Sequence, residues 1–205
     1  MNTLSQPQRW NEMKDKLLRW LSILLDSSVL AVPIFIGAAY SETQAFLPAL
    51  GWAVLALLFA DGVPLMYIAL GRKLGFVSGF DLPRREERAP FIAVNLVGNL
   101  LGFFFLRSLN APVFLSVLLL VYVALGVTMM TFSSLWKISL HAGGVGGFAA
   151  FLTSAFGLPW AWTFLALPLI GWVRVYRKRH TLAQVVAGGI VGAGVTWIVL
   201  ALVLG

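Results

Sequence analysis

Seven long apolar runs, separated by short polar links, make up most of this 205-residue chain. A helix of about 20 apolar residues crosses the hydrocarbon core of a bilayer, and shorter runs suffice where interfacial aromatic residues support their ends. With 60% hydrophobic and 11% charged residues, the chain carries more apolar surface than a water-soluble domain of this size can bury. We therefore expect an all-α, polytopic transmembrane helix bundle of about six to seven spans. The expected spans are residues 20–39, 48–70, 90–106, 112–132, 141–157, 159–173 and 183–204.

The chain divides into a polar lead-in at residues 1–19 and a single transmembrane domain at residues 20–205. The lead-in mixes cations and carboxylates in an amphipathic pattern, with tryptophans placed for a membrane interface. Its charged part is long and no clear small-residue cleavage site follows the first apolar run, so we do not expect a signal peptide. The runs at 90–106 and 159–173 are short enough for a tilted or broken helix.

Cations concentrate on one side when seven spans are threaded through a membrane. That side holds 14 of the 15 Lys and Arg residues, and only Arg107 lies opposite. Because cytoplasmic links carry the excess of Lys and Arg in membrane proteins, the N-terminus and this cationic side are predicted to be cytoplasmic in a cell-membrane protein. The net charge of +7 does not indicate nucleic-acid binding, since no basic amphipathic helix or aromatic-interleaved basic strand accompanies it. Anionic lipid headgroups are the expected partner.

The residues able to do chemistry are few. The chain has no cysteine and only two histidines, His141 and His180, which argues against a disulfide framework, a thiolate nucleophile and most metal centres. We therefore expect no metal and no cofactor. The same threading brings three polar segments to the cationic side, because two spans separate each segment from the next. These segments are residues 81–90, 137–141 and 174–184.

Two of these segments carry spacings that resemble a known family. Arg174 lies six residues before His180, and Gln184 lies four residues after it. The tripeptide Ser139-Leu140-His141 comes earlier, and His180 lies 39 residues after His141. This order is similar to the second and third motifs of the PAP2 (type 2 phosphatidic acid phosphatase) superfamily. The third motif of that family has an acidic residue where this chain has a glutamine.

The first motif of the family has a weaker counterpart. That motif is usually a Lys followed at a distance by Arg-Pro, whereas here Arg84, Arg85 and Arg88 precede Pro90 at altered spacing. The resemblance covers about residues 72–204, and the first spans carry no signature. It implies a PAP2-like helical core for that part of the chain.

The resemblance implies a metal-independent, two-step hydrolysis of a lipid phosphate or diphosphate, such as phosphatidic acid, phosphatidylglycerophosphate or an isoprenyl phosphate. His180 would attack phosphorus and form a phosphohistidine, while His141 would protonate the departing lipid oxygen. Arg174 would hold the phosphate oxygens together with first-motif arginines, since guanidinium groups match phosphate geometry. Ser139 would add a hydroxyl or a backbone N–H at a helix start, and Lys137 would add a further cation.

Each assignment has a plainer alternative. Gln184 would orient His180 less strongly than the usual carboxylate does, or it would cap the last helix in a Thr-x-x-Gln capping box. The run Arg177-Lys178-Arg179 also suits a basic loop at anionic headgroups, and Lys137 suits a cation that reaches the interface by its long side chain. The arginines at 84–88 alternate with glutamates, as in a solvated ion-pair turn.

Three rival functions remain open: a phosphotransferase of the same fold, a silent relative that binds lipid phosphate, and a transporter. The transporter interpretation uses Asp26 and Asp61, because an ionisable group within a span is a functional candidate; pairing with Asn95 or Asn99 is the structural alternative. Glycines at small-xxx-small spacing predict a close helix approach that draws the two histidines together. These glycines are Gly143, Gly147, Gly188 and Gly192. The motifs encode neither the lipid tail nor the oligomeric state.

Overall fold

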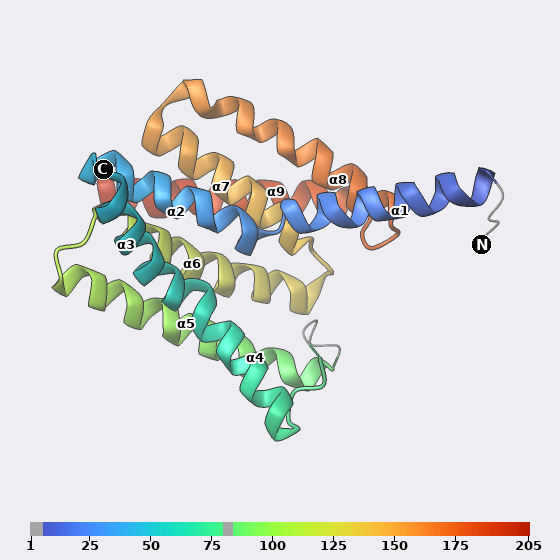
Figure 1. Cartoon of the computed structure of the whole chain (residues 1–205), viewed down its shortest axis with the longest axis horizontal. Helices are drawn as coiled ribbons and strands as arrows, with labels where there is room; N and C mark the ends of the chain where they lie inside the picture. Colours follow the sequence, from blue (N-terminus) through green and yellow to red (C-terminus); the bar gives the residue numbers. More distant parts are fainter. Residues whose placement is uncertain (1–5, 80–83) are drawn as a thin grey trace.

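The computed structural model describes residues 6–79 and 84–205, without the side chains of residues 6–12, 27, 85, 88 and 133–135. All regular structure among them is helical, and the helices pack as one bundle from which the first helix projects (Figure 1). The elements are α1 (Gln6–Leu24), α2 (Ser27–Thr43), α3 (Phe46–Leu57), η1 (Leu58–Gly62), α4 (Val63–Leu74), α5 (Arg85–Ser108), α6 (Val113–Leu135), α7 (Leu140–Phe156), η2 (Leu158–Leu165), α8 (Ala166–Tyr176) and α9 (Leu182–Leu204).

Within the described residues, six helical stretches are long and apolar enough to cross a membrane. This confirms a multi-pass, all-helical membrane protein. The remaining expected span, residues 141–157, corresponds to α7, an apolar helix of 17 residues that is shorter than the six stretches. The six stretches are Met13–Thr43, Phe46–Leu74, Ala89–Ser108, Val113–Phe132, Leu158–Tyr176 and Leu182–Leu204.

Three of the spanning stretches are interrupted, each for a local reason. The first breaks at Asp26, whose Oδ1 accepts a hydrogen bond from the Ser28 backbone N–H at 3.1 Å and so caps α2. The helix α1 continues to Leu24, so it includes part of the polar lead-in and the start of the first apolar run. The second stretch contains a π-helical turn, η1, just before Pro64. The fifth, Leu158–Tyr176, begins as the 3-10 segment η2, in keeping with the broken helix expected there.

The tightest contact in the bundle joins α7 to α9, and glycine makes it possible. A Cβ atom added to Gly192 would overlap the backbone carbonyl of Gly143, and one added to Gly188 would overlap the carbonyl of Ser139. Small residues let membrane helices approach to backbone contact in this way, as the glycine spacing predicts. The start of α7 is thereby held against the first turns of α9.

The links between helices sort to the two ends of the bundle. In Figure 1 the links before α5, before α7 and before α9 lie at one end, and the links before α3, α6 and η2 lie at the other end with the C-terminus. The first end carries residues 136–139 and 177–181, which belong to the two motif-like segments. The three segments that sequence threading placed together therefore share one end of the molecule, which we call the cationic end.

Candidate functional site

The turn between α8 and α9 explains the spacing of Arg174 and His180. The backbone N–H groups of Arg179 and His180 both donate to the Arg174 carbonyl, at 3.0 and 3.4 Å. Lys178, which directly precedes Arg179, adopts the left-handed conformation with φ +52°. Many helices close their C-terminal end with a residue in this conformation. The six residues from Arg174 to His180 therefore form one closed turn, in which the His180 backbone lies next to the Arg174 carbonyl.

Gln184 lies in the first turn of α9, where it serves two roles. Its Oε1 accepts from the Thr181 backbone N–H at 3.0 Å, and its own N–H donates to Thr181 Oγ1 at 3.3 Å. This is the expected capping box. The Gln184 side chain also makes a polar contact with the His180 imidazole that favours the protonated ring. The capping box is therefore formed, and the same side chain acts on the pKa of His180.

Ser139 ties the second motif-like segment to the third. It is fully buried, and its backbone N–H donates to the Gln184 carbonyl at 3.2 Å. Its hydroxyl accepts from the Ala142 N–H at 3.4 Å and caps α7. Because this backbone contact joins α7 to α9 directly, His141 and His180 sit at the starts of two helices that touch. The hydroxyl predicted to face a phosphate is used for capping.

His180 lies among cations that act directly on its ring. Burial lowers the pKa of His180 to about 4, with further lowering from the charges of Arg174, Lys137 and His141, while the Gln184 contact opposes the shift. The ring is therefore neutral at pH 7, which is the form with a lone pair for nucleophilic attack. Lys137 is itself exposed, on the link between α6 and α7.

Two polar atoms at this turn are buried without a hydrogen-bond partner: Arg174 Nε and His180 Nδ1. Arg174 also makes no ion pair with any carboxylate among the residues that the structure describes. A buried polar group left unsatisfied costs about 1–3 kcal/mol, so such groups call for a ligand or a functional explanation. An oxyanion beside Arg174 would supply the missing acceptor.

His141 has a partner that the motifs did not indicate. Its Nε2 lies 3.1 Å from Asp26 Oδ2, across the contact between α2 and α7. The Ser28 hydroxyl contacts both Asp26 and Asp61, so the polar contacts continue from the histidine toward the π-helical turn η1. The available signal was Asp26 itself, a carboxylate within an apolar run in a chain that has only two histidines.

The asparagines expected to pair with these carboxylates bind each other instead. Asn99 Nδ2 donates to the Asn95 backbone carbonyl at 2.8 Å and to Asn95 Oδ1 at 3.3 Å. Both residues lie on α5. Among the described residues Asp26 therefore pairs with His141, and the Asn99 amide N–H groups bond within α5, while Asn99 Oδ1 is buried without a hydrogen-bond partner there.

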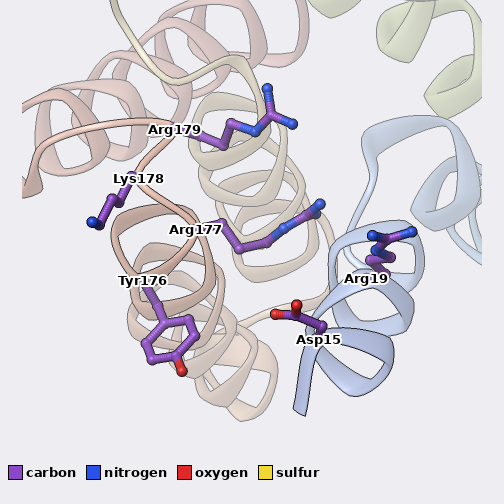
Figure 2. Close-up of a pocket in the computed structure, with 6 residues that line it drawn as sticks. All are labelled: Asp15, Arg19, Tyr176, Arg177, Lys178 and Arg179. Carbon is purple, nitrogen blue, oxygen red and sulfur yellow. The ribbon is translucent and has the colours of Figure 1, made fainter. Parts of the chain in front are cut away.

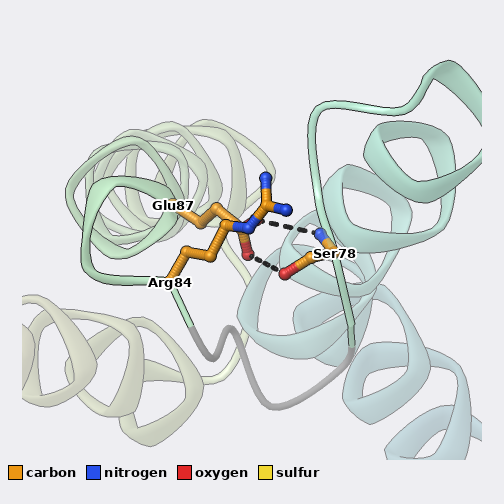
Figure 3. Close-up of polar contacts among 3 residues, drawn as sticks. All are labelled: Ser78, Arg84 and Glu87. Carbon is orange, nitrogen blue, oxygen red and sulfur yellow. Dashed lines mark hydrogen bonds and ion pairs between the residues drawn. The ribbon is translucent and has the colours of Figure 1, made fainter.

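Arg84, from the first-motif counterpart, is engaged elsewhere (Figure 3). Glu87 is buried and accepts from both the backbone N–H and the hydroxyl of Ser78, each at 3.0 Å. Arg84 Nε approaches Glu87 at 3.9 Å while its side chain stays 71% exposed. This is the ion-pair turn, and Arg84 is not among the charges that act on His180. The side chains of Arg85 and Arg88 lie outside the described residues.

No group of three or more His, Asp or Glu side chains within the described ranges is arranged to hold a metal ion. Comparison with protein-family models, with curated protein sequences and with solved structures gives no match to this chain. Function must therefore be inferred from the site itself: His180, His141, Arg174, Lys137, Gln184 and Ser139 at the cationic end, with Asp26 behind His141.

Proposed function

We propose that this protein is an integral membrane lipid phosphatase of the PAP2 type, which hydrolyses a lipid phosphate or diphosphate through a phosphohistidine. One observation carries the proposal: a neutral His180 is held by a closed turn against Arg174, whose Nε is buried without a partner. An unprotonated imidazole beside an unpaired guanidinium suits attack on a phosphate more than a structural role.

The first step forms a bond between the His180 ring and phosphorus and breaks the bond from phosphorus to the lipid oxygen. His141 gives its proton to the departing oxygen, so a neutral alcohol leaves from a monophosphate; with a diphosphate, the bond from the terminal phosphorus to the bridging oxygen breaks and the lipid monophosphate leaves with that proton. Because Asp26 engages Nε2 of His141, the transferred proton would come from Nδ1. In the second step water attacks the phosphohistidine, His141 takes the proton from water, and inorganic phosphate and the neutral His180 are regenerated.

Charge on the phosphoryl group needs cations throughout both steps. Arg174 offers a planar fork for two phosphate oxygens. Lys137, whose charge reaches His180, takes the second position that the resemblance assigns to Arg84, Arg85 or Arg88. Preorganised cations of this kind stabilise the charge that develops at the transferring phosphate.

The location suits a substrate that stays in the bilayer. His180 lies between the ends of two spanning stretches, Leu158–Tyr176 and Leu182–Leu204. The phosphate would reach the site at headgroup depth while the tail remains among lipids. The proposed substrates are therefore lipid phosphates such as phosphatidic acid, phosphatidylglycerophosphate or isoprenyl phosphates and diphosphates.

The test is phosphate release by purified protein from a panel of lipid phosphates with EDTA present. Wild type and Arg107→Gln, which removes a cation from the opposite end, should be active. His180→Ala should lose activity by about a thousandfold or more, and His141→Ala should also be severely impaired. Labelled substrate should leave acid-labile phosphate on the wild type but none on His180→Ala.

Activity that persists in His180→Ala, or that EDTA abolishes, would contradict the proposal. Adding an alcohol acceptor separates hydrolysis from transfer, because a transferase moves the phosphoryl group to the alcohol in preference to water. A folded wild type that binds lipid phosphate but releases no phosphate from any member of the panel would establish the silent relative instead.

A further inference from the structure

A second cationic feature lies beside the candidate site, where α1 meets the turn between α8 and α9. A pocket of about 240 Å³ opens there. It is lined by Asp15, Arg19, Tyr176, Arg177, Lys178 and Arg179. In Figure 2 the Arg177 side chain reaches from the turn toward α1, where Asp15 and Arg19 lie, whereas Lys178 points away. Two segments distant in sequence therefore form one pocket.

The charge of this pocket is strongly unbalanced. Among the described residues, three arginines and Lys178 line the pocket with one carboxylate, Asp15. Within the part of the chain that the structure describes, Arg19, Arg177 and Arg179 form no ion pair, with Asp15 or with any other carboxylate. Exposed cations held together without counter-charges attract an anion, and arginine suits a phosphate in particular.

The surroundings place the pocket at the surface of a bilayer. Tyr176 is the last residue of a spanning stretch, and half of its side chain is exposed, as is common for tyrosines at the membrane interface. On α1, Met13, Leu17, Trp20 and Leu24 form an apolar stripe in which every side chain is more than half exposed. Because these residues belong to the first stretch apolar enough to cross a membrane, Met13–Thr43, the exposed stripe is expected to contact lipid. Anionic headgroups are then the nearest phosphates.

The size of the pocket indicates what it can hold. A volume of about 240 Å³ lies below the range of roughly 300–1,000 Å³ that is typical of sites for whole drug-sized ligands. It accommodates a headgroup while the acyl chains remain outside, next to the apolar stripe of α1. Polar and cationic walls beside an apolar helix face match the two halves of a phospholipid.

We propose that this pocket binds the phosphodiester headgroup of an anionic phospholipid of the surrounding bilayer and thereby fastens α1 to the turn that carries His180. The bound lipid is a resident ligand and not a substrate, because a phosphodiester such as phosphatidylglycerol is outside the monoester and diphosphate class proposed above. The inference concerns Arg19, Arg177 and Arg179, and it stands whether or not the protein is a phosphatase.

The experiment measures lipid binding to His180→Ala protein, which excludes turnover. Protein in an uncharged detergent is titrated with phosphatidylglycerol or phosphatidylcholine, and bound lipid is counted by native mass spectrometry. Arg177→Gln/Arg179→Gln is compared with Lys14→Gln/Lys16→Gln, which removes the same number of charges from α1 outside the pocket. Arg174→Gln reports on the candidate active site, and size-exclusion chromatography verifies folding of each variant.

We expect phosphatidylglycerol to bind about tenfold or more tightly than phosphatidylcholine, because each cation near a membrane surface contributes to attraction. Arg177→Gln/Arg179→Gln should abolish that preference, whereas Lys14→Gln/Lys16→Gln and Arg174→Gln should keep it. Asp15→Asn should strengthen it, since the carboxylate that lines the pocket among the described residues is then neutral.

Three outcomes would overturn the inference. Equal binding of the two lipids would remove the need for a headgroup site. Equal loss in the two double variants would indicate diffuse attraction to the positive surface, and loss confined to Arg174→Gln would place the lipid in the candidate active site. A competition measurement adds inorganic phosphate to the lipid-bound protein. If phosphate displaces phosphatidylglycerol at equal concentration, the pocket is a site for free phosphate and the lipid assignment is wrong.

Discussion

Two arginine-bearing links at the cationic end contrast with each other. The link from α8 to α9 closes on the Arg174 carbonyl and leaves the Arg174 guanidinium without an ion-pair partner among the described residues. The link from α4 to α5 instead presents Arg84 to solvent, 3.9 Å from Glu87. Both links carry the same residue type on the same side of the bundle, but only the first holds its arginine beside His180.

The comparison shows why Arg174, and not Arg84, is available for the proposed phosphate: no carboxylate neutralises it. Glu87 is buried against Ser78 and still lies next to Arg84, whereas the turn from Arg174 to His180 contains no carboxylate. A guanidinium without a counter-charge retains its capacity for a substrate anion.

The largest difference in activity is expected between variants of Arg174 and Arg84. Arg174→Gln should lower kcat/KM for lipid phosphate hydrolysis by about a hundredfold to a thousandfold, the range for losing one preorganised group at a transferring charge. Arg84→Gln should change kcat/KM less than about threefold, because an exposed ion pair contributes little. Steady-state kinetics of the two purified variants makes the comparison. Equal losses would mean that the α4–α5 link reaches the phosphate after all.

A smaller effect is expected from the carboxylate behind His141. Asp26→Asn should reduce kcat by about tenfold to a hundredfold with little change in KM, since the partner of a catalytic histidine orients the ring without touching substrate. Asp61→Asn should stay close to wild type, because an amide can still meet the Ser28 hydroxyl. The transporter interpretation predicts the opposite order, namely proton flux that is lost in Asp61→Asn while phosphate release is absent from the start.

The smallest effect is expected in the pH dependence of kcat/KM when Gln184 is replaced. The pKa of His180 is about 4 and the neutral ring is the reactive form, so wild-type kcat/KM should fall as the pH decreases through about 4. Gln184→Asp places a negative charge beside the ring and should raise that pKa, which moves the acid limb upward by about one pH unit. Activity at pH 7–8 should be kept or increased.

The measurement is kcat/KM from pH 3.5 to 9, which reports groups of the free enzyme, with folding verified at each pH by size-exclusion chromatography. A large loss of activity in folded Gln184→Asp, or an acid limb that stays in place, would mean that Gln184 serves only the capping box.

Much of this arrangement could be predicted from the sequence. Run length determines which segments can cross a bilayer, and two spans between successive polar segments bring them to one end. The capping box follows from Thr181 and Gln184, whereas the closed turn behind the interval between Arg174 and His180 is seen only in the structure. The glycines of α7 and α9 predict the close approach that the structure has.

The rest depends on contacts that no local pattern determines. The hydropathy of an apolar run does not reveal that Asp26 divides it, although Asp-Ser-Ser is a helix-start signal. Its bond to His141 arises only when α2 packs on α7. Likewise, Glu87 bonds to a serine nine residues earlier, and the α4–α5 turn that results leaves Arg84 outside the site.

The backbone carbonyl of Arg174 accepts from both Arg179 and His180, and this determines how the proposed site would respond to its bilayer. One residue supplies the carbonyl that holds the His180 backbone and the guanidinium proposed to hold phosphate, so the distance between nucleophile and cation is set within a single stretch of chain. His141, in contrast, depends on contact between separate helices. A change in membrane thickness that tilts those helices would therefore disturb proton delivery before it disturbs attack on phosphorus.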